Sequence, residues 1–211
     1  DLIESGSFHT IMLRHIFRQA SESDIVMNAH RILEGTSLPM DNKSRDFFFL
    51  ERDQVPVIYK HTVQLIRQML PGYVGCRPED IQVLTPMRRG NLGVARLNEV
   101  LQSVLNPPAA GKREHEDHDT VFREGDKVMQ TCNDYDLQYE RQDGENGAGV
   151  YNGDIGYIEQ VDPSEPALRV RFDDRVVVYA AEQIEELEPA YAVTIHKSQG
   201  CEFPAVVIPV A

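Results

Sequence analysis

Near the end of the chain, an apolar segment is followed directly by a cluster of polar side chains. The segment is AYAVTIHKSQGCEFPAVVIPV, residues 190–210, and donors follow its apolar start at Thr194, His196, Lys197, Ser198 and Gln199. Gly200 lets the backbone turn or approach a ligand closely, and Glu202 adds a carboxylate. If the apolar segment is a strand of a parallel sheet, the cluster lies at the edge where such sheets bind ligands. The residues predict a polar ligand site, with an ordinary polar loop as the alternative.

A second candidate is the connection VLTPMRRGNLGVARLNEVLQSVLNP, residues 83–107. Its apolar strand ends at Thr85 and Pro86, and Arg88 and Arg89 lie in a glycine-bounded turn before the next helix. Guanidinium groups in such a turn are suited to contact phosphate oxygens. On chemistry alone, a solvated loop is an equally good interpretation.

Arg18, in the segment IFRQA, is a third candidate. An arginine is always charged, and its planar group can hold two phosphate oxygens at once. Without further information, a solvated or salt-bridged surface charge is the simpler interpretation of this residue.

The elements that must position these residues change character along the chain. Helical periodicity is predicted in three segments: ESDIVMNAHRILEG, residues 22–35, where Ile25, Ala29, Ile32 and Leu33 recur, then 56–70, then 94–105. A short strand is predicted at Phe47–Leu50, and a buried strand in DIQVLTP, residues 80–86. Helix, strand, glycine turn and helix in succession are typical of a parallel α/β sheet.

The middle of the chain predicts a different fold. Residues 107–120 form a polar linker rich in helix breakers, and four short strands follow in KVMQTC, IGYIEQV, ALRVRF and RVVVY. YERQDGENGAG between them is predicted to be a flexible loop, and Gly125, Gly153 and Gly156 are assigned to turns. Four or five strands in about 70 residues indicate a small antiparallel barrel. From Ala190 the pattern returns to that of the first sheet.

Charge supports the same division. The net charge is −13, and residues 111–189 contain 8 Lys and Arg against 21 Asp and Glu, which accounts for all of the excess. The three cysteines, Cys76, Cys132 and Cys201, are far apart and form no CxxC pair, so they favour a reducing cytoplasm over a disulfide framework or zinc site. The aspartates of the barrel match no calcium loop, and no apolar run is long enough to span a bilayer.

Together, these motifs resemble one protein family. The segment TIHKSQGCEF is similar to motif V of RecD-like superfamily 1 helicases, and the aromatic-Arg-Gln of IFRQA is similar to motif IV. The pattern TPMRRGxxGxxxLNxxLQxxLNP is similar to RecD-like and conjugative-transfer helicases. GDKVMQTCNDYD, residues 125–136, and VYNGDIGYI, residues 150–158, resemble the Src-homology-3-like insertion of that family. We therefore expect an internal fragment of an ATP-dependent DNA helicase of the 5′-to-3′ branch, close to the exonuclease V alpha subunit.

The resemblance implies a fold and residue roles. We expect a RecA-like parallel sheet with helices on both faces, built from residues 1–112 and 189–211, and interrupted by a Src-homology-3-like β-barrel at 113–188. The residues expected to face single-stranded DNA are Thr85, Pro86, Met87, Arg88, Thr194, His196 and Lys197. Those expected near ATP are Gln199, Gly200, Glu202 and Arg18, with Arg18 reaching the γ-phosphate as a catalytic residue. Cys201 stands where the family usually carries Ser.

The resemblance also implies cofactors and partners. The intact parent would use ATP and Mg²⁺, whereas this chain contains no GxxxxGK[ST] and is expected to bind neither alone. The expected partners are single-stranded DNA, a first motor domain in cis and other exonuclease V subunits, in the cytoplasm and without a membrane. Two alternatives stay open: the helicase portion of a conjugative relaxase, and a non-enzymatic DNA- or protein-binding module. For the barrel, we hypothesise an independently folded insertion whose acidic surface does not supply phosphate contacts. Any contact with DNA would be local, through residues such as Arg123 or Lys127, or steric, as a wedge or guide for the strand.

Overall fold

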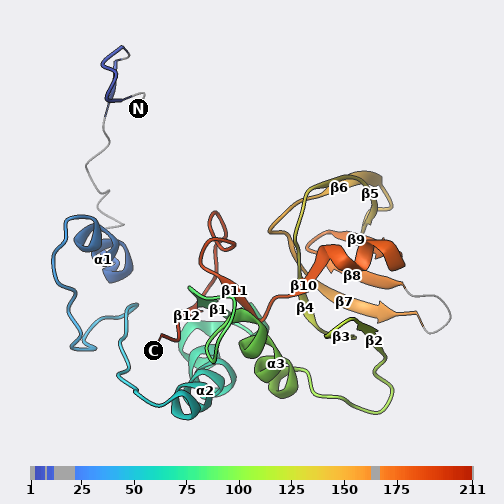
Figure 1. Cartoon of the computed structure of the whole chain (residues 1–211), viewed down its shortest axis with the longest axis horizontal. Coiled ribbons are helices and arrows are strands. Elements are labelled where there is room, and N and C mark those ends of the chain that lie inside the picture. The colour runs from blue at the N-terminus through green and yellow to red at the C-terminus, as the bar shows by residue number, and fades with distance from the viewer. Residues whose placement is uncertain (1–2, 8, 12–21, 163–166, 211) are drawn as a thin grey trace. The chain divides into compact units, whose positions relative to one another are not determined.

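A computed structural model describes residues 3–7, 9–11, 22–162 and 167–210 (Figure 1). The chain divides into two compact units, Asp1–Glu51 and Arg52–Ala211. This boundary was not among those predicted, because no change of composition marks it. No helix among the described residues is long and apolar enough to cross a membrane.

The first unit contains the helix α1, Asp24–Leu33, as predicted. Ser23 caps its first turn by accepting a hydrogen bond from the backbone N–H of Val26, and the Asp46 carboxylate accepts one from that of Asp24. The predicted apolar stripe is nevertheless exposed: Ile25, Ile32 and Leu33 are 55%, 63% and 83% accessible.

The predicted strand at Phe47–Leu50 is wrong, because these residues form no strand. The side chain of Asn42 takes the place of a partner strand. Its Nδ2 donates to the Phe49 carbonyl at 2.8 Å, and its Oδ1 accepts from the Phe49 N–H at 2.7 Å. A carboxamide can satisfy one residue's backbone in this way but cannot extend a ladder.

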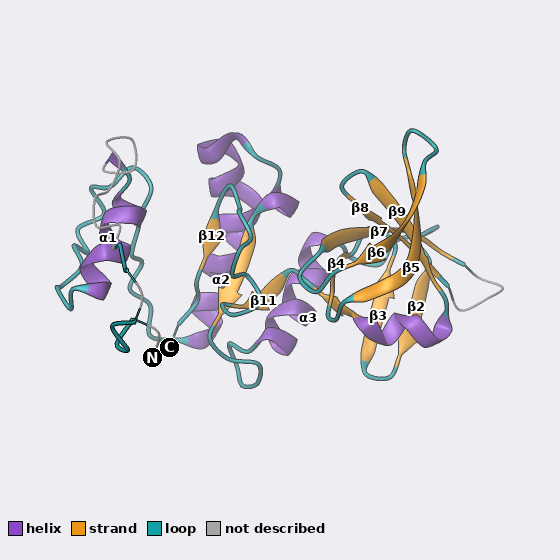
Figure 2. Ribbon diagram, turned by 90° about the horizontal axis from the view of Figure 1, so that it is seen from above, coloured by secondary structure: helices purple, strands orange, loops and turns teal. Residues whose placement is uncertain are grey.

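The second unit contains a three-stranded parallel sheet in the order β11-β1-β12 (Figure 2). These strands are Ala192–Thr194, Gln82–Thr85 and Val206–Val207. The helix α2, Val55–Gln64, starts beside Pro56 and continues through a π-helical turn at Leu65–Met69, and the helix α3 spans Val94–Leu105. Ile66, Leu97 and Leu101 pack with Val83 and Ala192 in one hydrophobic cluster, which fixes both helices to the sheet.

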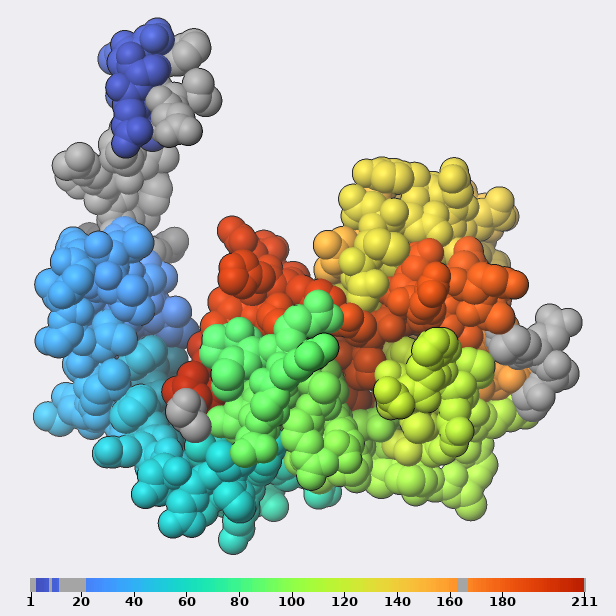
Figure 3. Space-filling model, in the orientation of Figure 1, coloured from blue at the N-terminus to red at the C-terminus, as the bar shows by residue number. Residues whose placement is uncertain are grey.

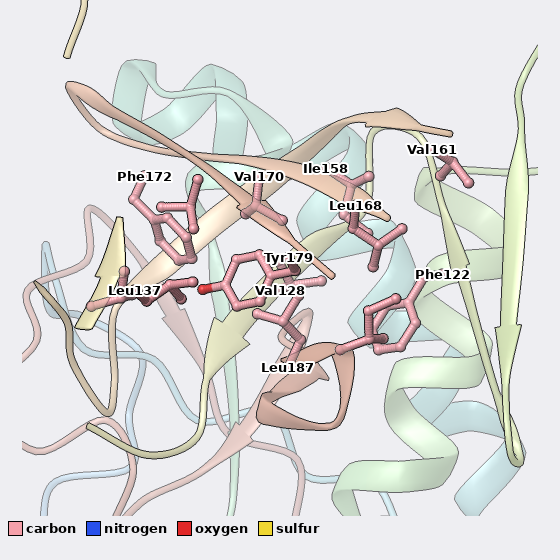
Figure 4. Close-up of a cluster of buried hydrophobic side chains, with 13 residues drawn as sticks. Phe122, Val128, Leu137, Ile158, Val161, Leu168, Val170, Phe172, Tyr179 and Leu187 are labelled. Carbon is pink, nitrogen blue, oxygen red and sulfur yellow. The ribbon is translucent and has the colours of Figure 1, made fainter. Parts of the chain in front are cut away.

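The same unit contains a seven-stranded antiparallel sheet in the order β10-β4-β7-β8-β9-β5-β6, which occupies the region predicted as a barrel and keeps the name barrel. In chain order its strands are β4 Lys127–Gln130, β5 Asp134–Arg141, β6 Asn146–Val150, β7 Ile155–Val161, β8 Leu168–Phe172, β9 Arg175–Tyr179 and β10 Leu187–Pro189. Its core gathers residues from most of these strands, among them Val128, Ile158, Val170 and Tyr179 (Figure 4). The chain therefore combines α/β structure with a large antiparallel sheet, which agrees with the predicted fold class.

Three details of this region differ from prediction. YERQDGENGAG is not a flexible loop but most of the hairpin of β5 and β6. The polar linker contains β2, Glu114–Asp117, which pairs with β3, Thr120–Arg123. Gly156 lies within β7 and not in a turn. A Cβ at this position would meet the Arg171 carbonyl oxygen and the Phe172 ring at 2.8 Å. Close approach of neighbouring strands explains this glycine.

Candidate functional site

Two predicted site segments meet at the carboxyl end of the parallel sheet. β1 and β11 are adjacent and parallel, and Thr85 at the end of β1 is in register with Thr194 at the end of β11. The ladder continues one step further, where the Ile195 N–H donates to the Thr85 carbonyl at 3.2 Å. The residues that follow the two strands, around positions 90 and 200, accordingly lie side by side on the surface (Figure 3).

The turn after β1 is organised by Thr85 itself. This side chain is fully buried, and its hydroxyl donates to the Leu92 carbonyl at 2.7 Å and accepts from the Met87 N–H at 3.3 Å. At Gly93, which ends the turn, a Cβ would lie 2.6 Å from the Arg89 carbonyl carbon, so only glycine fits. Thr85 therefore supports the turn, and Pro86, Met87 and Arg88 form its exposed surface.

The loop after β11 is a succession of tight turns. The Thr194 hydroxyl accepts from the Lys197 N–H at 3.3 Å, and the Ser198 hydroxyl donates to the Ile195 carbonyl at 2.8 Å. Of the remaining predicted site residues on this loop, four are exposed: His196, Gln199, Gly200 and Glu202. Gly200 adopts a φ of 89°, in the left-handed region. The loop thus presents three polar side chains to solvent from a fixed backbone.

A carboxylate from the barrel joins the two segments. Glu188 in β10 accepts from Arg88 Nη2 at 2.9 Å through Oε1, and from Lys197 Nζ at 2.7 Å through Oε2. Arg88, Thr194 and Lys197 line a small cavity of about 10 Å³ together with Glu188. The structure therefore brings together three of the predicted DNA-facing residues, Arg88, Thr194 and Lys197, and adds a carboxylate that was not predicted. Thr85, the fourth residue at these strand ends, is in register with Thr194, but its side chain is buried and does not reach the surface.

Behind this surface, a buried hydrogen-bond network connects α3, the barrel and the parallel sheet. At its centre is the Asp126 carboxylate, which is fully buried. It accepts from Gln102 Nε2 at 2.6 Å, Asn106 Nδ2 at 2.7 Å, the Arg123 N–H at 2.7 Å and the Tyr191 hydroxyl at 2.9 Å. Burial, followed by the neighbouring Asp126 carboxylate, raises the pKa of Tyr191. A buried carboxylate with this many donors is stabilised in place.

Asn98 extends the network to the strand that enters the site. Its Nδ2 donates to the carbonyls of Pro189 and Ala192, both at 2.9 Å, and its Oδ1 accepts from the Ala192 N–H at 2.8 Å. Asn98 and Gln102 lie four residues apart on one face of α3, and Asn106, four residues further on, is the residue that caps its C-terminus. That spacing is visible in the sequence as a polar stripe on the helix, but its burial is not, and nothing in the sequence marks Glu188.

Arg123 and Lys127, the examples named for a local contact between the barrel and DNA, are buried. Arg123 Nε lies 2.6 Å from Glu114 Oε1, and Lys127 Nζ donates to the Glu79 carbonyl at 2.9 Å and lies 5.9 Å from the centre of the Phe203 ring. Burial lowers the pKa of Lys127 to about 8. Arg123 and Lys127 are only 6% and 3% exposed, so neither can make the local DNA contact for which they were candidates.

Arg18 lies outside the described residues. Within the described ranges, no group of three or more His, Cys, Asp or Glu is arranged to hold a metal ion. The surface at the carboxyl ends of β1 and β11 carries hydrogen-bond donors, the cations Arg88, Arg89 and Lys197, and the carboxylates Glu188 and Glu202.

Comparisons with known proteins agree with the resemblance in the motifs. Residues 97–172 match the family described as the ATP-dependent RecD-like DNA helicase SH3 domain. The chain is 33% identical over 197 residues to the ATP-dependent RecD2 DNA helicase of Deinococcus radiodurans, covering 93% of this chain and 24% of that protein. It is 32% identical over 129 residues to the RecBCD enzyme subunit RecD of Haemophilus influenzae, covering 61% of this chain and 17% of that protein. The chain spans about a quarter or less of the length of these relatives.

Solved structures of Pif1 helicases are also similar. One, of two coordinating Pif1 helicases at forked double-stranded DNA, has a TM-score of 0.40 at 17% identity and covers 77% of this chain and 42% of that one. Another, of Bacteroides Pif1 bound to single-stranded DNA, has a TM-score of 0.38 at 16% identity and covers 82% and 44%. The predicted resemblance to RecD-like helicases is confirmed by the sequence matches, and the matched SH3 domain begins within α3, the helix that the buried network joins to the barrel.

Proposed function

We propose that this chain, a relative of the RecD-like DNA helicases, forms part of the second motor domain of an ATP-dependent helicase that moves along single-stranded DNA. In this proposal, residues 1–112 and 189–211 belong to a RecA-like domain, and residues 113–188 are a barrel inserted into it. The observation that carries the proposal is the register of β1 with β11. It places Thr85 beside Thr194 and so joins two motifs that are far apart in the sequence.

The proposed DNA-binding surface is the carboxyl end of these two strands. Pro86, Met87, Arg88 and His196 are exposed there, and Lys197 is half-buried beside them. Two cations next to hydrogen-bond donors and an exposed Met suit a ligand with a phosphate backbone and apolar base or sugar surfaces. Binding that follows the backbone without reading bases is the mode we propose.

The proposed ATP-binding contacts are on the exposed part of the loop after β11. Gln199, Gly200 and Glu202 can offer a carboxamide, a backbone N–H and a carboxylate, which fits one side of a nucleotide site. Arg18 would supply charge to the γ-phosphate. We place the phosphate-cradling lysine and the Mg²⁺ ligands on a P-loop domain in cis, so this chain alone should not hydrolyse ATP.

The wider setting is also part of the proposal. We propose a role in DNA recombination or repair in the cytoplasm, with other exonuclease V subunits as partners, and the similarity to a RecBCD subunit supports it. In a parent protein that contains the P-loop domain, Arg18→Ala should lower ATP turnover by roughly 10²–10⁵-fold and leave DNA binding without nucleotide nearly unchanged.

The direct test is binding of a fluorescein-labelled oligothymidylate to the chain over a series of salt concentrations. Lys197→Ala should weaken binding and reduce the slope of log K against log salt by about 0.7, as expected for one phosphate contact on a single strand. Lys60→Ala removes the same charge from an exposed position on α2 and serves as the matched control. Equal effects of the two substitutions would remove the proposed site and favour a non-enzymatic module.

A further inference from the structure

The proposed DNA surface contains one acidic group, and it comes from the barrel. Glu188 lies in β10, opposite Met129 of β4, and reaches across to the ends of the parallel strands. Its two oxygens accept from Arg88 and Lys197, the two cations that we expect to contact phosphates. Glu188 therefore bonds to the groups that a nucleic-acid backbone would use.

A carboxylate offers a cation nearly what a phosphate offers. Both are anions whose oxygens accept charge-assisted hydrogen bonds at 2.7–2.9 Å, and the distances to Glu188 are 2.9 Å from Arg88 and 2.7 Å from Lys197. The cavity among these side chains has a volume of about 10 Å³, close to what one water molecule needs. A phosphate cannot enter it while Glu188 holds both cations.

We propose that Glu188 is a built-in phosphate mimic, which occupies Arg88 and Lys197 in the absence of nucleic acid and is displaced by a DNA phosphate. This inference rests on the proposed function of the two cations. The side chains of Arg88, Glu188 and Lys197 are 67%, 38% and 24% exposed, and ion pairs with such exposure contribute little to stability. A ligand that presents several phosphates in succession can therefore replace the carboxylate at low cost.

The proposal predicts a gain of binding on removal of the negative charge. Glu188→Gln keeps the size of the side chain but no longer neutralises Arg88 and Lys197. We expect it to bind a fluorescein-labelled oligothymidylate roughly 3–10-fold more tightly at low salt, which corresponds to the loss of one or two weak competing pairs. Glu188→Ala, a second variant without a hydrogen-bonding side chain, should change affinity in the same direction.

A matched control tests whether the gain in DNA affinity comes only from the change in net charge. Glu182→Gln changes the charge by the same amount at an exposed position of the short 3₁₀ segment before β10. The double variant Glu188→Gln, Lys197→Ala should lose most of the gain, because one of the two released cations is absent. Thermal unfolding of each variant should confirm that the fold is retained.

The outcomes separate this inference from the proposed function. If Lys197→Ala weakens binding but Glu188→Gln binds no more tightly than Glu182→Gln, the surface binds DNA and Glu188 is only a structural pair. Weaker binding by both Glu188 variants would also overturn the mimic, because the carboxylate would then help to form the site. If Lys197→Ala has no more effect than Lys60→Ala, the proposed function fails, and the mimic fails with it.

Discussion

Two carboxylates connect the barrel to the parallel sheet and its helices, and their surroundings differ in every respect. Asp126 is fully buried and accepts from four neutral donors, whereas Glu188 is partly exposed and accepts from two cations. A buried acceptor leaves its donors unsatisfied when it is removed, but an exposed ion pair exchanges readily for water and ions. Asp126 therefore maintains the fold, and the partners of Glu188 remain available to a ligand.

The largest expected effect tests the buried side of this comparison. Asp126→Ala would leave the side chains of Gln102, Asn106 and Tyr191 without their shared acceptor. We expect a loss of roughly 3–5 kcal/mol in the free energy of unfolding, measured by urea denaturation. Asp136→Ala, at an exposed position of the hairpin, is the control. A loss below about 1 kcal/mol would mean that water satisfies these donors equally well.

Asn98 should show the next largest effect. Asn98→Ala removes three hydrogen bonds to the backbone around the β10 to β11 connection and leaves those groups buried. The expected loss is roughly 2–3 kcal/mol by the same measurement. Since this connection carries Glu188 to the site, the variant should also alter DNA affinity. A stable variant with unchanged binding would show that the connection is held by other contacts.

The buried Lys127 should make the free energy of unfolding depend on pH. Its folded pKa of about 8 lies below the ordinary value of 10.5, so between these values the unfolded chain binds a proton that the folded chain does not. Stability contributed by this residue should therefore rise with pH, by about 2 kcal/mol between pH 7 and pH 9.5. Denaturation across this range should show the rise, and Lys127→Met should remove it. We limit the measurement to pH 9.5, below the ordinary tyrosine pKa of 10. Above that pH, tyrosines such as Tyr157, whose pKa burial raises to about 12, would lower the stability as the pH rises.

The smallest expected effect belongs to Glu188. Glu188→Gln should change the free energy of unfolding by less than about 1 kcal/mol, because both ion pairs are partly exposed. Urea denaturation beside the Asp126 variant gives the contrast directly. A loss of several kcal/mol would place Glu188 with Asp126 among the groups that maintain the fold.

The barrel shows where the sequence pattern was sufficient and where it was not. Short apolar segments, three of them with alternating residues, predicted β4, β7, β8 and β9, but the hairpin of β5 and β6 contains Gly, Asp and Asn and was predicted to be a loop. The polar composition of this segment reflects its exposure to solvent. Its strand conformation depends on the pairing of β5 with β9, which the local sequence does not show.

The hypothesis of an independently folded barrel also changes. Leu84 and Val193 of the parallel sheet share a hydrophobic cluster with Met129 of the barrel, and Tyr191 reaches Asp126. We now expect that replacing residues 113–188 with a flexible linker would expose this cluster and leave α3 with unsatisfied side chains. Urea denaturation of the variant with this replacement would show whether the rest of the domain folds without the barrel or depends on it.

The sequence by itself determined several helices and strands and the chemistry near each motif. Apolar periodicity is a local property, so it placed α2, α3 and β1, and the segment around Lys197 carried its own donors. Only the tertiary structure decided which distant groups meet. It placed Thr85 beside Thr194, buried Arg123 and Lys127, and brought Glu188 between Arg88 and Lys197. The physical reason is that burial and ion pairing depend on chain segments that are neighbours in space, and residue type alone does not specify them.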